Sequence, residues 1–382
     1  MLVPRTRVLY VIDSLAPGGA ETSLVAMAPG LRDHGIDLHV LPLGTRHDLA
    51  VALVDGGATV HQQTGPQGRV RNVRRVVDVG RRTRPHLVHT TLFEADVAGR
   101  TAARLLRVPV TSSLVADAYA PAHYAEHHRA KLRAAQTLDA ATARFASRFH
   151  ALTAAIADSV APRLGIPADR VEVIPRGRDP ETHPFRPARW RAAVRSELDL
   201  HETTPVVLAV GRLDPPKGLA ELLAALPLLV RTQPDLEVLV AGKDGLASEA
   251  LRATVREQSL PVTFLGHRED VPRLLAAADV LVMPSLREGM GGVLLEAMAA
   301  GCPIVASSIP TSREVLANGE CGRLAPVGDP AALAHAVAET LGERGTTTER
   351  VRRARARFDA DYSIAGVNAR MAHFFQLQAR RG

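Results

Sequence analysis

The chain has 382 residues, of which 46% are hydrophobic and 23% charged, and its formal net charge is +7. This length suits two soluble domains, and the positive charge favours anionic partners such as nucleotide phosphates or lipid headgroups. No apolar run approaches the roughly 18 residues of a membrane span, and no leader pattern precedes the first strand, so we expect a cytoplasmic protein. Cys302 and Cys321 show no zinc spacing and are expected in the core.

Short apolar runs alternate with helical stretches through the first half of the chain. This alternation is typical of a doubly wound parallel sheet covered by helices on both faces. We expect this α/β domain to span residues 1–179, because the prolines around Arg176–Pro180 indicate a linker. The runs that we expect to form its strands are residues 7–13, 37–43, 87–90, 108–115, 149–153 and 171–174.

A loop with two adjacent glycines, Gly18 and Gly19, follows the first run. A strand, a glycine loop and a helix begin a Rossmann-like half, but adjacent glycines do not match the G-x-G-x-x-G dinucleotide fingerprint. We therefore interpret the pair either as a place where a ligand or a second domain approaches the backbone, or as a plain turn.

A basic amphipathic helix is predicted between Arg69 and Arg84. Its arginines suit an anionic membrane surface, where each adds roughly 1 kcal/mol, although a merely solvated helix face is the simpler interpretation. The stretch lacks the aromatic residues that nucleic-acid-binding surfaces interleave with basic ones, which argues against nucleic acid as a partner.

Polar residues also gather after the run at 108–115. Asp117, Tyr119 and His123 are candidates for contact with an acceptor. His123 with His127 and His128 also raises the hypothesis of a metal site. Adjacent histidines on a helix point about 100° apart, however, and suit shared ligation poorly.

The second half of the chain repeats the alternation and predicts a second Rossmann-like domain over residues 180–364. Its expected strands are residues 205–211, 236–242, 262–266, 280–284 and 303–307. Two such domains imply a cleft, because open parallel sheets bind ligands at the carboxyl ends of their strands. Residues 365–382 are expected to add a helix that packs back on the first domain.

Two cations follow the first of these strands, in the segment Gly211–Gly218 with the sequence GRLDPPKG. Arg212 offers a planar guanidinium fork and Lys217 a compact charge, a combination suited to a diphosphate. A solvated surface pair is the alternative.

The segment Glu288–Ala300, EGMGGVLLEAMAA, predicts a turn and a helix start behind a buried strand. Its three glycines leave the first backbone amides of the helix uncovered, and such amides attract phosphate. Glu288 and Glu296 flank these amides, and carboxylates accept hydrogen bonds from hydroxyl groups. A ligand with phosphate and hydroxyls, such as a sugar nucleotide, is therefore predicted, with a plain turn and two solvated glutamates as the alternative.

In order and spacing, four segments resemble those of a retaining glycosyltransferase of family 4 with the GT-B fold. The segments are GGAE at Gly18–Glu21, VIPRGRD at Val173–Asp179, GRLDPPKG at Gly211–Gly218 and EGMGGVLLEAMA at Glu288–Ala299. The resemblance covers nearly the whole chain. It implies two Rossmann-like domains, a donor sugar linked to UDP or GDP, transfer to an acceptor hydroxyl with retention, and no metal or other cofactor.

The resemblance also implies roles for individual residues. Arg212 and Lys217 would hold the donor diphosphate and stabilise the departing charge. Glu288 would contact the donor sugar and Glu296 the ribose, and the amides of Met290–Val293 would contact the diphosphate. The other implied donor-side positions are Gly18, Gly19, Gly266, His267, Gly289, Gly291 and Gly292, with Gly266 and His267 where the family seats the base.

Three positions depart from the family pattern. Many relatives carry a histidine just after the run at 108–115, and this chain does not. Either Asp117 or Tyr119 has a related role, or no residue is required in that role. Arg176 replaces the usual asparagine and adds a cation beside Arg178. Gly292 stands where a larger apolar residue is common, which suggests room for an unusual sugar.

The sequence therefore predicts a hexosyltransferase whose acceptor is a sugar, a lipid-linked molecule or a small molecule. Synthesis of cell-surface polysaccharide, glycolipid or secondary-metabolite glycosides would fit. A sugar-nucleotide epimerase of the same fold is one alternative. A catalytically silent partner of another transferase is a second, although the presence of Arg212, Lys217, Glu288 and Glu296 argues against it.

Overall fold

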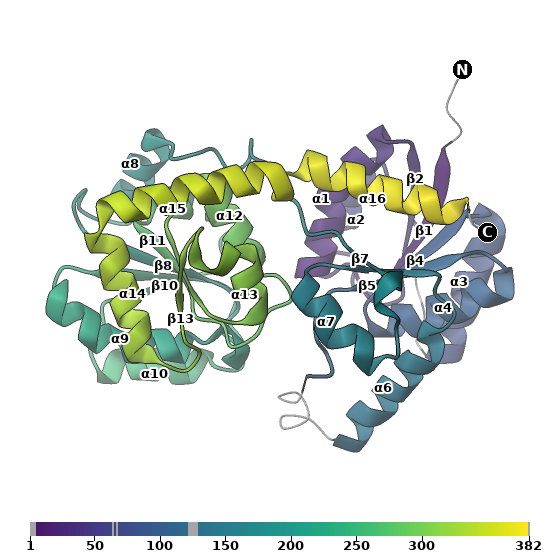
Figure 1. Cartoon of the computed structure of the whole chain (residues 1–382), viewed down its shortest axis with the longest axis horizontal. Coiled ribbons are helices and arrows are strands. Elements are labelled where there is room, and N and C mark those ends of the chain that lie inside the picture. Colours follow the sequence, from purple (N-terminus) through teal and green to yellow (C-terminus); the bar gives the residue numbers. More distant parts are fainter. Residues whose placement is uncertain (1–4, 63–64, 66–67, 121–128, 381–382) are drawn as a thin grey trace. The chain divides into compact units, whose positions relative to one another are not determined.

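The computed structural model describes residues 5–62, 65, 68–120 and 129–380. The chain divides into two compact units (Figure 1). Unit 1 contains Met1–Gly177 and Ile364–Gly382, and unit 2 contains Arg178–Ser363. Each unit is a parallel sheet with helices on its faces, as the alternation of apolar runs predicts.

The sheet of unit 1, within the part of the chain that the structure describes, has seven parallel strands in the order β3-β2-β1-β4-β5-β6-β7. Their bounds are β1 Thr6–Ile12, β2 Ile36–Pro42, β3 Thr59–Val60, β4 Leu87–Thr91, β5 Val110–Leu114, β6 Arg148–Ala151 and β7 Val171–Val173. All but β3 coincide with runs expected from the sequence. At two residues, β3 is too short to show an apolar pattern.

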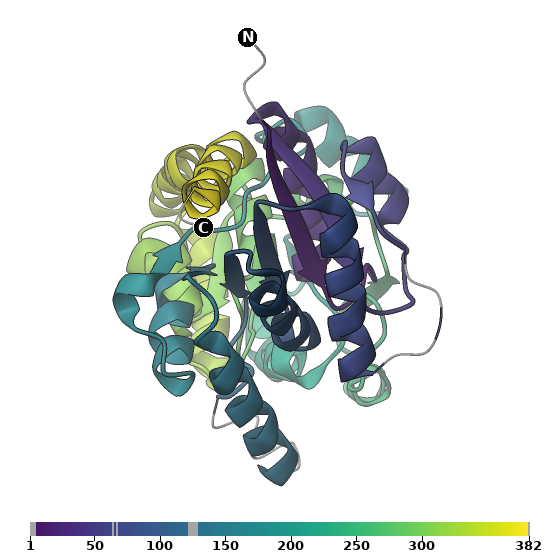
Figure 2. The same ribbon diagram turned by 90° about the vertical axis from the view of Figure 1, so that its right-hand side faces the viewer.

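Helices cover both faces of this sheet, and β1 shows how the core divides between them. Val8 and Tyr10 join a cluster with α1 and the last helix, whereas Leu9 and Val11 join one with α3 and α4, on the opposite face (Figure 2). This is the period of two expected of a strand buried on both faces. The helices are α1 Gly19–Asp33, α2 Ala50–Asp55, α3 Arg69–Thr83, α4 Phe93–Leu106, α6 Arg129–Ala143, α7 Ala154–Arg163 and α16 Ile364–Ala379, with a short 3-10 turn at Ala168–Arg170.

The last helix, α16, belongs to the core of unit 1 although it ends the chain. Val367, Met371, Phe374 and Phe375 are each at most 1% exposed and pack in the same cluster as Leu24 of α1. The tail helix expected at 365–382 therefore completes the first unit.

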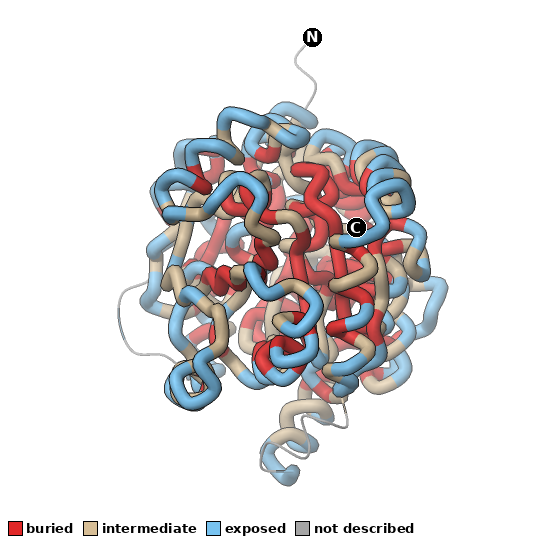
Figure 3. Tube along the Cα trace, turned by 90° about the vertical axis from the view of Figure 1, so that its left-hand side faces the viewer, coloured by how far each residue is buried: buried red, intermediate tan, exposed pale blue. Residues whose placement is uncertain are grey.

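Every residue of unit 2 is described in the structure. Its sheet has six parallel strands in the order β10-β9-β8-β11-β12-β13. The strands are β8 Val206–Val210, β9 Glu237–Ala241, β10 Val262–Gly266, β11 Val280–Met283, β12 Ile304–Ser307 and β13 Arg323–Ala325. Buried residues make up most of the central strands β9, β8, β11 and β12, and exposed residues lie mainly on the surrounding helices and loops (Figure 3). The strand β13, a three-residue edge strand, was not predicted from the sequence.

The helices of unit 2 follow its strands in the usual α/β alternation. They are α8 Ala188–Glu197, α9 Leu219–Thr232, α10 Ser248–Glu257, α11 Val271–Ala277, α12 Gly292–Ala300, α13 Pro310–Val315, α14 Pro330–Gly342 and α15 Arg344–Arg357, with shorter turns at Pro215–Lys217, Ala317–Gly319 and Phe358–Tyr362.

Two buried histidines of unit 1 form a directional hydrogen-bond chain. The carbonyl oxygen of Ile174 can only accept, so His150 Nε2 donates to it (2.6 Å) and His150 Nδ1 accepts from the Ser113 hydroxyl (2.9 Å). Ser113 in turn accepts from His89 Nε2 (2.8 Å), whose Nδ1 accepts from Thr111 (2.8 Å). Burial lowers the pKa of His150 to about 4 and that of His89 well below its usual value, so both rings are neutral.

These neutral histidines predict an acid-linked loss of stability. The stability that depends on a neutral His150 is fully present above pH 6.5 and is lost as the pH falls toward 4, because the unfolded chain then binds a proton that the folded chain does not. The loss reaches about 1.4 kcal/mol per pH unit for this ring. His150→Gln should flatten the fall of the urea midpoint between pH 6.5 and pH 4.

His373→Gln serves as the control, because His373 is an exposed residue of the same unit. Its midpoint should follow the wild-type pH dependence. Equal slopes for the wild type and His150→Gln would contradict the assignment of a neutral buried ring.

Candidate functional site

Loops that carry the predicted donor-binding residues of unit 2 meet at one edge of its sheet. The strands β8, β10 and β11 are parallel and end at Val210, Gly266 and Met283. The loop after β8 carries Arg212 and Lys217, and the loop after β11 leads into α12. The carboxyl edge of a parallel sheet is where α/β proteins bind ligands.

Lys217 and Glu288 form an ion pair between two of these loops. Lys217 Nζ lies 2.6 Å from Glu288 Oε1, and the hydroxyl of Ser285 donates to the same oxygen at 2.9 Å. The Glu288 side chain is 13% exposed and that of Lys217 34%. The two contacts to Oε1 therefore hold the carboxylate in one orientation.

Gly218 sets the close approach of the two loops that this ion pair joins. Its φ is +64°, and a Cβ at this position would overlap the carbonyl oxygen of Pro284. The amide of Leu286 also donates to the carbonyl oxygen of Pro216, at 2.9 Å. Only a residue without a side chain permits this approach, which brings Lys217 within reach of Glu288.

The helix α12 begins where the glycine pattern predicts. Gly291, with a φ of +77°, caps it and Gly292 is its first residue. Met290 is 1% exposed and anchors the loop before the cap. Glu296 lies in the second turn, so its side chain and the first amides of α12 occupy the same end of the helix.

Glu296 is also held by a cation. Arg178 Nε donates to Glu296 Oε1 at 2.8 Å, and the two side chains are 17% and 19% exposed. The sequence analysis named Arg178 only as an additional cation. Its contact with Glu296 spans 118 positions of the chain and has no signal in the local pattern.

The remaining donor-side candidates of unit 2 are more exposed. The Arg212 side chain is 60% exposed, and its Nε lies 3.5 Å from Asp214 Oδ2. Gly266 ends β10, where its carbonyl oxygen accepts from the amide of Gly242 at 2.7 Å. His267, which follows, is exposed.

In unit 1, Gly18 caps α1 and Gly19 is its first residue. The side chain of Glu21 lies nearest to Gly18, and a Cβ at Gly19 would lie 2.7 Å from Arg176 Nη1. Both neighbours belong to unit 1. Burial raises the pKa of Glu21, and the positive charge of Arg176 opposes this shift. The structure thus places Arg176 against the glycine loop.

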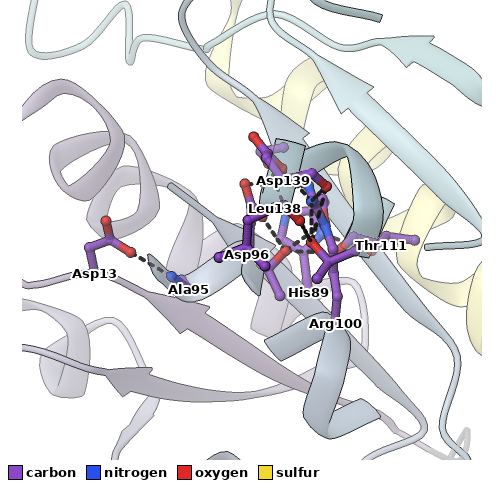
Figure 4. A network of polar contacts seen from close by, with 12 residues as sticks. Asp13, His89, Ala95, Asp96, Arg100, Thr111, Leu138 and Asp139 are labelled. Carbon is purple, nitrogen blue, oxygen red and sulfur yellow. Dashed lines mark hydrogen bonds and ion pairs between the residues drawn. The ribbon is translucent and has the colours of Figure 1, made fainter. Parts of the chain in front are cut away.

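Asp117 and Tyr119, the acceptor-side candidates, make contacts inside unit 1. The buried hydroxyl of Tyr119 donates to Asp139 Oδ2 at 2.8 Å, and Asp139 Oδ1 accepts from the fully buried Arg100 at 2.6 Å (Figure 4). Asp117 accepts from Arg163 and from a serine of α7. Both side chains thereby tie the loop after β5 to neighbouring helices, and their contact with an acceptor stays a prediction.

His123, His127 and His128 lie outside the described residues. Among the residues that are described, no group of three or more His, Cys, Asp or Glu side chains could hold a metal ion. None of the helices described there is long and apolar enough to cross a membrane.

Comparison with known proteins identifies the family. Residues 17–182 match the family described as Glycosyltransferase Family 4, and residues 204–343 match that of Glycosyl transferases group 1. A glycogen synthase of Mycobacterium tuberculosis is 32% identical over 304 residues, which cover 78% of this chain and 70% of the relative. The chain belongs to glycosyltransferase family 4. It is therefore an enzyme of the glycosyltransferase class.

Further known proteins are similar over part or all of the chain. A phosphatidyl-myo-inositol mannosyltransferase of Mycolicibacterium smegmatis is 39% identical over 181 residues, covering 46% of either chain. The crystal structure of Anabaena HepE with UDP-glucose is 26% identical, covers 97% of this chain and all of the HepE chain, and has a TM-score of 0.84. HepE has also been solved with UDP, with the same TM-score. These structures show that unit 1 and unit 2 are the two Rossmann-like domains of the GT-B fold.

Gly218→Ala tests whether the close approach of the two loops assembles the site. Alanine at a left-handed φ costs about 1–2 kcal/mol, and overlap with the Pro284 carbonyl adds to this cost because backbone must move. We expect a larger loss of stability in urea unfolding, together with a loss of nucleotide binding measured by calorimetry.

Gly328→Ala is the matched control, since Gly328 has a φ of +72° and a Cβ added there would meet no other atom within 4 Å. It should show only the cost of the left-handed backbone and should bind nucleotide normally. Indistinguishable stability and binding in the two variants would contradict the role given to Gly218.

Proposed function

We propose that this glycosyltransferase moves a sugar from a UDP- or GDP-linked donor to an acceptor hydroxyl with retention of the anomeric configuration. The observation that carries the proposal is the amino end of α12, flanked by Glu288 and Glu296, each ion-paired with a cation of unit 2. Uncovered amides and cations suit a diphosphate, and the carboxylates suit sugar hydroxyls.

The similar proteins support a nucleotide donor. HepE, a structural neighbour, was solved with UDP and with UDP-glucose. The Mycolicibacterium relative is named for mannose transfer to phosphatidyl-myo-inositol, which supports a lipid-linked acceptor beside a sugar or a small molecule. UDP and GDP are therefore both tested below.

In the proposed reaction, the bond between the anomeric carbon and the diphosphate oxygen breaks, and the acceptor oxygen bonds to that carbon on the same face. The acceptor proton passes to the departing phosphate. Lys217 and Arg212 stabilise the negative charge that develops on the diphosphate, which is the largest electrostatic task of the step. Glu288 orients the donor sugar and Glu296 the ribose. No metal is required, so a chelator should leave activity unchanged.

The exposed basic face of α3 favours an anionic membrane as the location of a lipid-linked acceptor. Arg71, Arg74, Arg81 and Arg82 are exposed, whereas Val76 and Val79 of the same helix are buried. The protein should then cosediment with phosphatidylserine vesicles at low salt and dissociate when the charges are screened. Equal cosedimentation of a variant with these four arginines changed to glutamine would indicate that the face is merely solvated.

A thermal-shift panel with UDP, GDP and ADP tests the donor site. A nucleotide at a hundred times its dissociation constant adds about 2.7 kcal/mol of stability, so the wild-type midpoint should rise with UDP or GDP. Glu296→Ala should weaken this shift, because the ribose loses its carboxylate partner. Lys217→Ala should lower transfer by about a hundredfold or more, as expected for loss of one preorganised charge at a developing anion.

Lys131→Ala is the control for removal of a lysine, since Lys131 is exposed on α6 of unit 1. It should bind and transfer as the wild type does. The absence of any nucleotide shift in the wild type would contradict the proposed donor, and an inverted anomeric NMR signal in the product would contradict retention.

A further inference from the structure

Arg178 occupies an unusual place for a cation, at the amino end of a helix. Its main chain is fixed, because its amide donates to the Tyr362 carbonyl oxygen at 3.0 Å and it forms an isolated bridge with Ser363. Its Nε pairs with Glu296, and its Nη2 lies 2.5 Å from the position that a Cβ of residue 292 would take. The guanidinium therefore lies against the first residue of α12.

Gly292 is what permits this placement. Any side chain at position 292 would begin inside the space that Nη2 fills, so the guanidinium could not stay where it is. The sequence analysis suggested that Gly292 makes room for an unusual sugar. The structure instead fills that room with Arg178, which accounts for the departure from the family pattern at Gly292.

The local charges favour an anion at this end of α12. The amino end of a helix carries a partial positive charge and disfavours a cation. Glu296 offsets part of this effect through one oxygen, and the nearby His183 is 8% exposed with a pKa that burial lowers, so it adds no positive charge of its own at neutral pH. A bound phosphate would favour both the helix amides and the guanidinium.

We propose that Arg178 is a further donor-binding residue. It holds Glu296 in position for the ribose, contacts the donor diphosphate beside the first turn of α12, and depends on Gly292 for its place. This inference rests on the proposed function, since it requires a nucleoside diphosphate at this end of unit 2. Arg178, at the start of unit 2, would then be a third cation of the donor site, in addition to Arg212 and Lys217 of the loop after β8.

The test is calorimetric titration of the full chain with UDP and GDP, and with uridine and guanosine as probes that lack phosphate. Arg178→Val removes the guanidinium and leaves the charge of Glu296 facing the phosphates. We expect the diphosphates to bind about tenfold or more weakly, the size of one charge-assisted hydrogen bond. Nucleoside affinity should fall less, because uridine and guanosine lose only the positioning of Glu296, whereas the diphosphates also lose the guanidinium contact. Equal losses for both kinds of ligand would indicate that Arg178 only supports the fold.

Gly292→Ala provides an independent route to the same loss, because the added Cβ displaces the guanidinium without removing its charge. The double variant Arg178→Val/Gly292→Ala should bind no more weakly than Arg178→Val alone, since residues in contact are not additive. Arg178→Lys, which keeps a charge without the fork, should give an intermediate loss, and it carries the test if the valine variant unfolds. Arg353→Val is the control, because Arg353 pairs with Glu349 on the surface of α15.

The outcomes separate this inference from the function on which it rests. If the wild type binds a nucleoside diphosphate, Lys217→Ala weakens it and Arg178→Val does not, the role of Arg178 is wrong and the donor site stands. If neither UDP nor GDP binds the wild type, the proposed function is wrong and the role of Arg178 falls with it. Fully additive losses for Arg178→Val and Gly292→Ala would overturn the dependence of Arg178 on Gly292.

Discussion

The ion pair between Lys217 and Glu288 is the interaction on which the candidate site depends. The two residues are 71 positions apart, and they meet because their loops leave the same edge of the sheet and touch at Gly218. In the proposed donor complex the pair resolves an electrostatic difficulty, because a carboxylate beside the diphosphate would otherwise repel it. Arg178 does the same for Glu296. With both carboxylates neutralised, the amides of α12 can attract an anion while the glutamates accept hydrogen bonds from hydroxyls.

The fold was largely predictable from the sequence, for a simple physical reason. A parallel strand buried on both faces reads as a continuous apolar run, as Val280–Met283 does, and the glycines after it predict the cap of α12. The exceptions were β3 and β13, which have two and three residues at sheet edges. Neither Thr59–Val60 nor Arg323–Ala325 forms an apolar run, so only their neighbours in the folded sheet define these two strands.

The types of residue at the site were predictable, but their partners were not. The glycine pattern places Glu288 in the loop before α12 and Glu296 in its second turn, whereas the pairing of Glu296 with Arg178 depends on where the chain enters unit 2. The role of Gly292 could not be predicted from the sequence either, because it depends on the position of the neighbouring guanidinium in the folded chain. Tyr119 is a third case, since the sequence marks it as polar and the structure buries its hydroxyl against Asp139.

The central claim is that the donor nucleotide binds at the amino end of α12, beside the loop after β8. Hydrogen exchange of backbone amides, followed by mass spectrometry with and without the nucleotide that binds, tests this most directly. The account predicts slower exchange in residues 211–218 and 288–296, because bound phosphate engages the amides there and orders both loops. A bound nucleotide that leaves exchange in these two segments unchanged, and slows it elsewhere, would contradict the account.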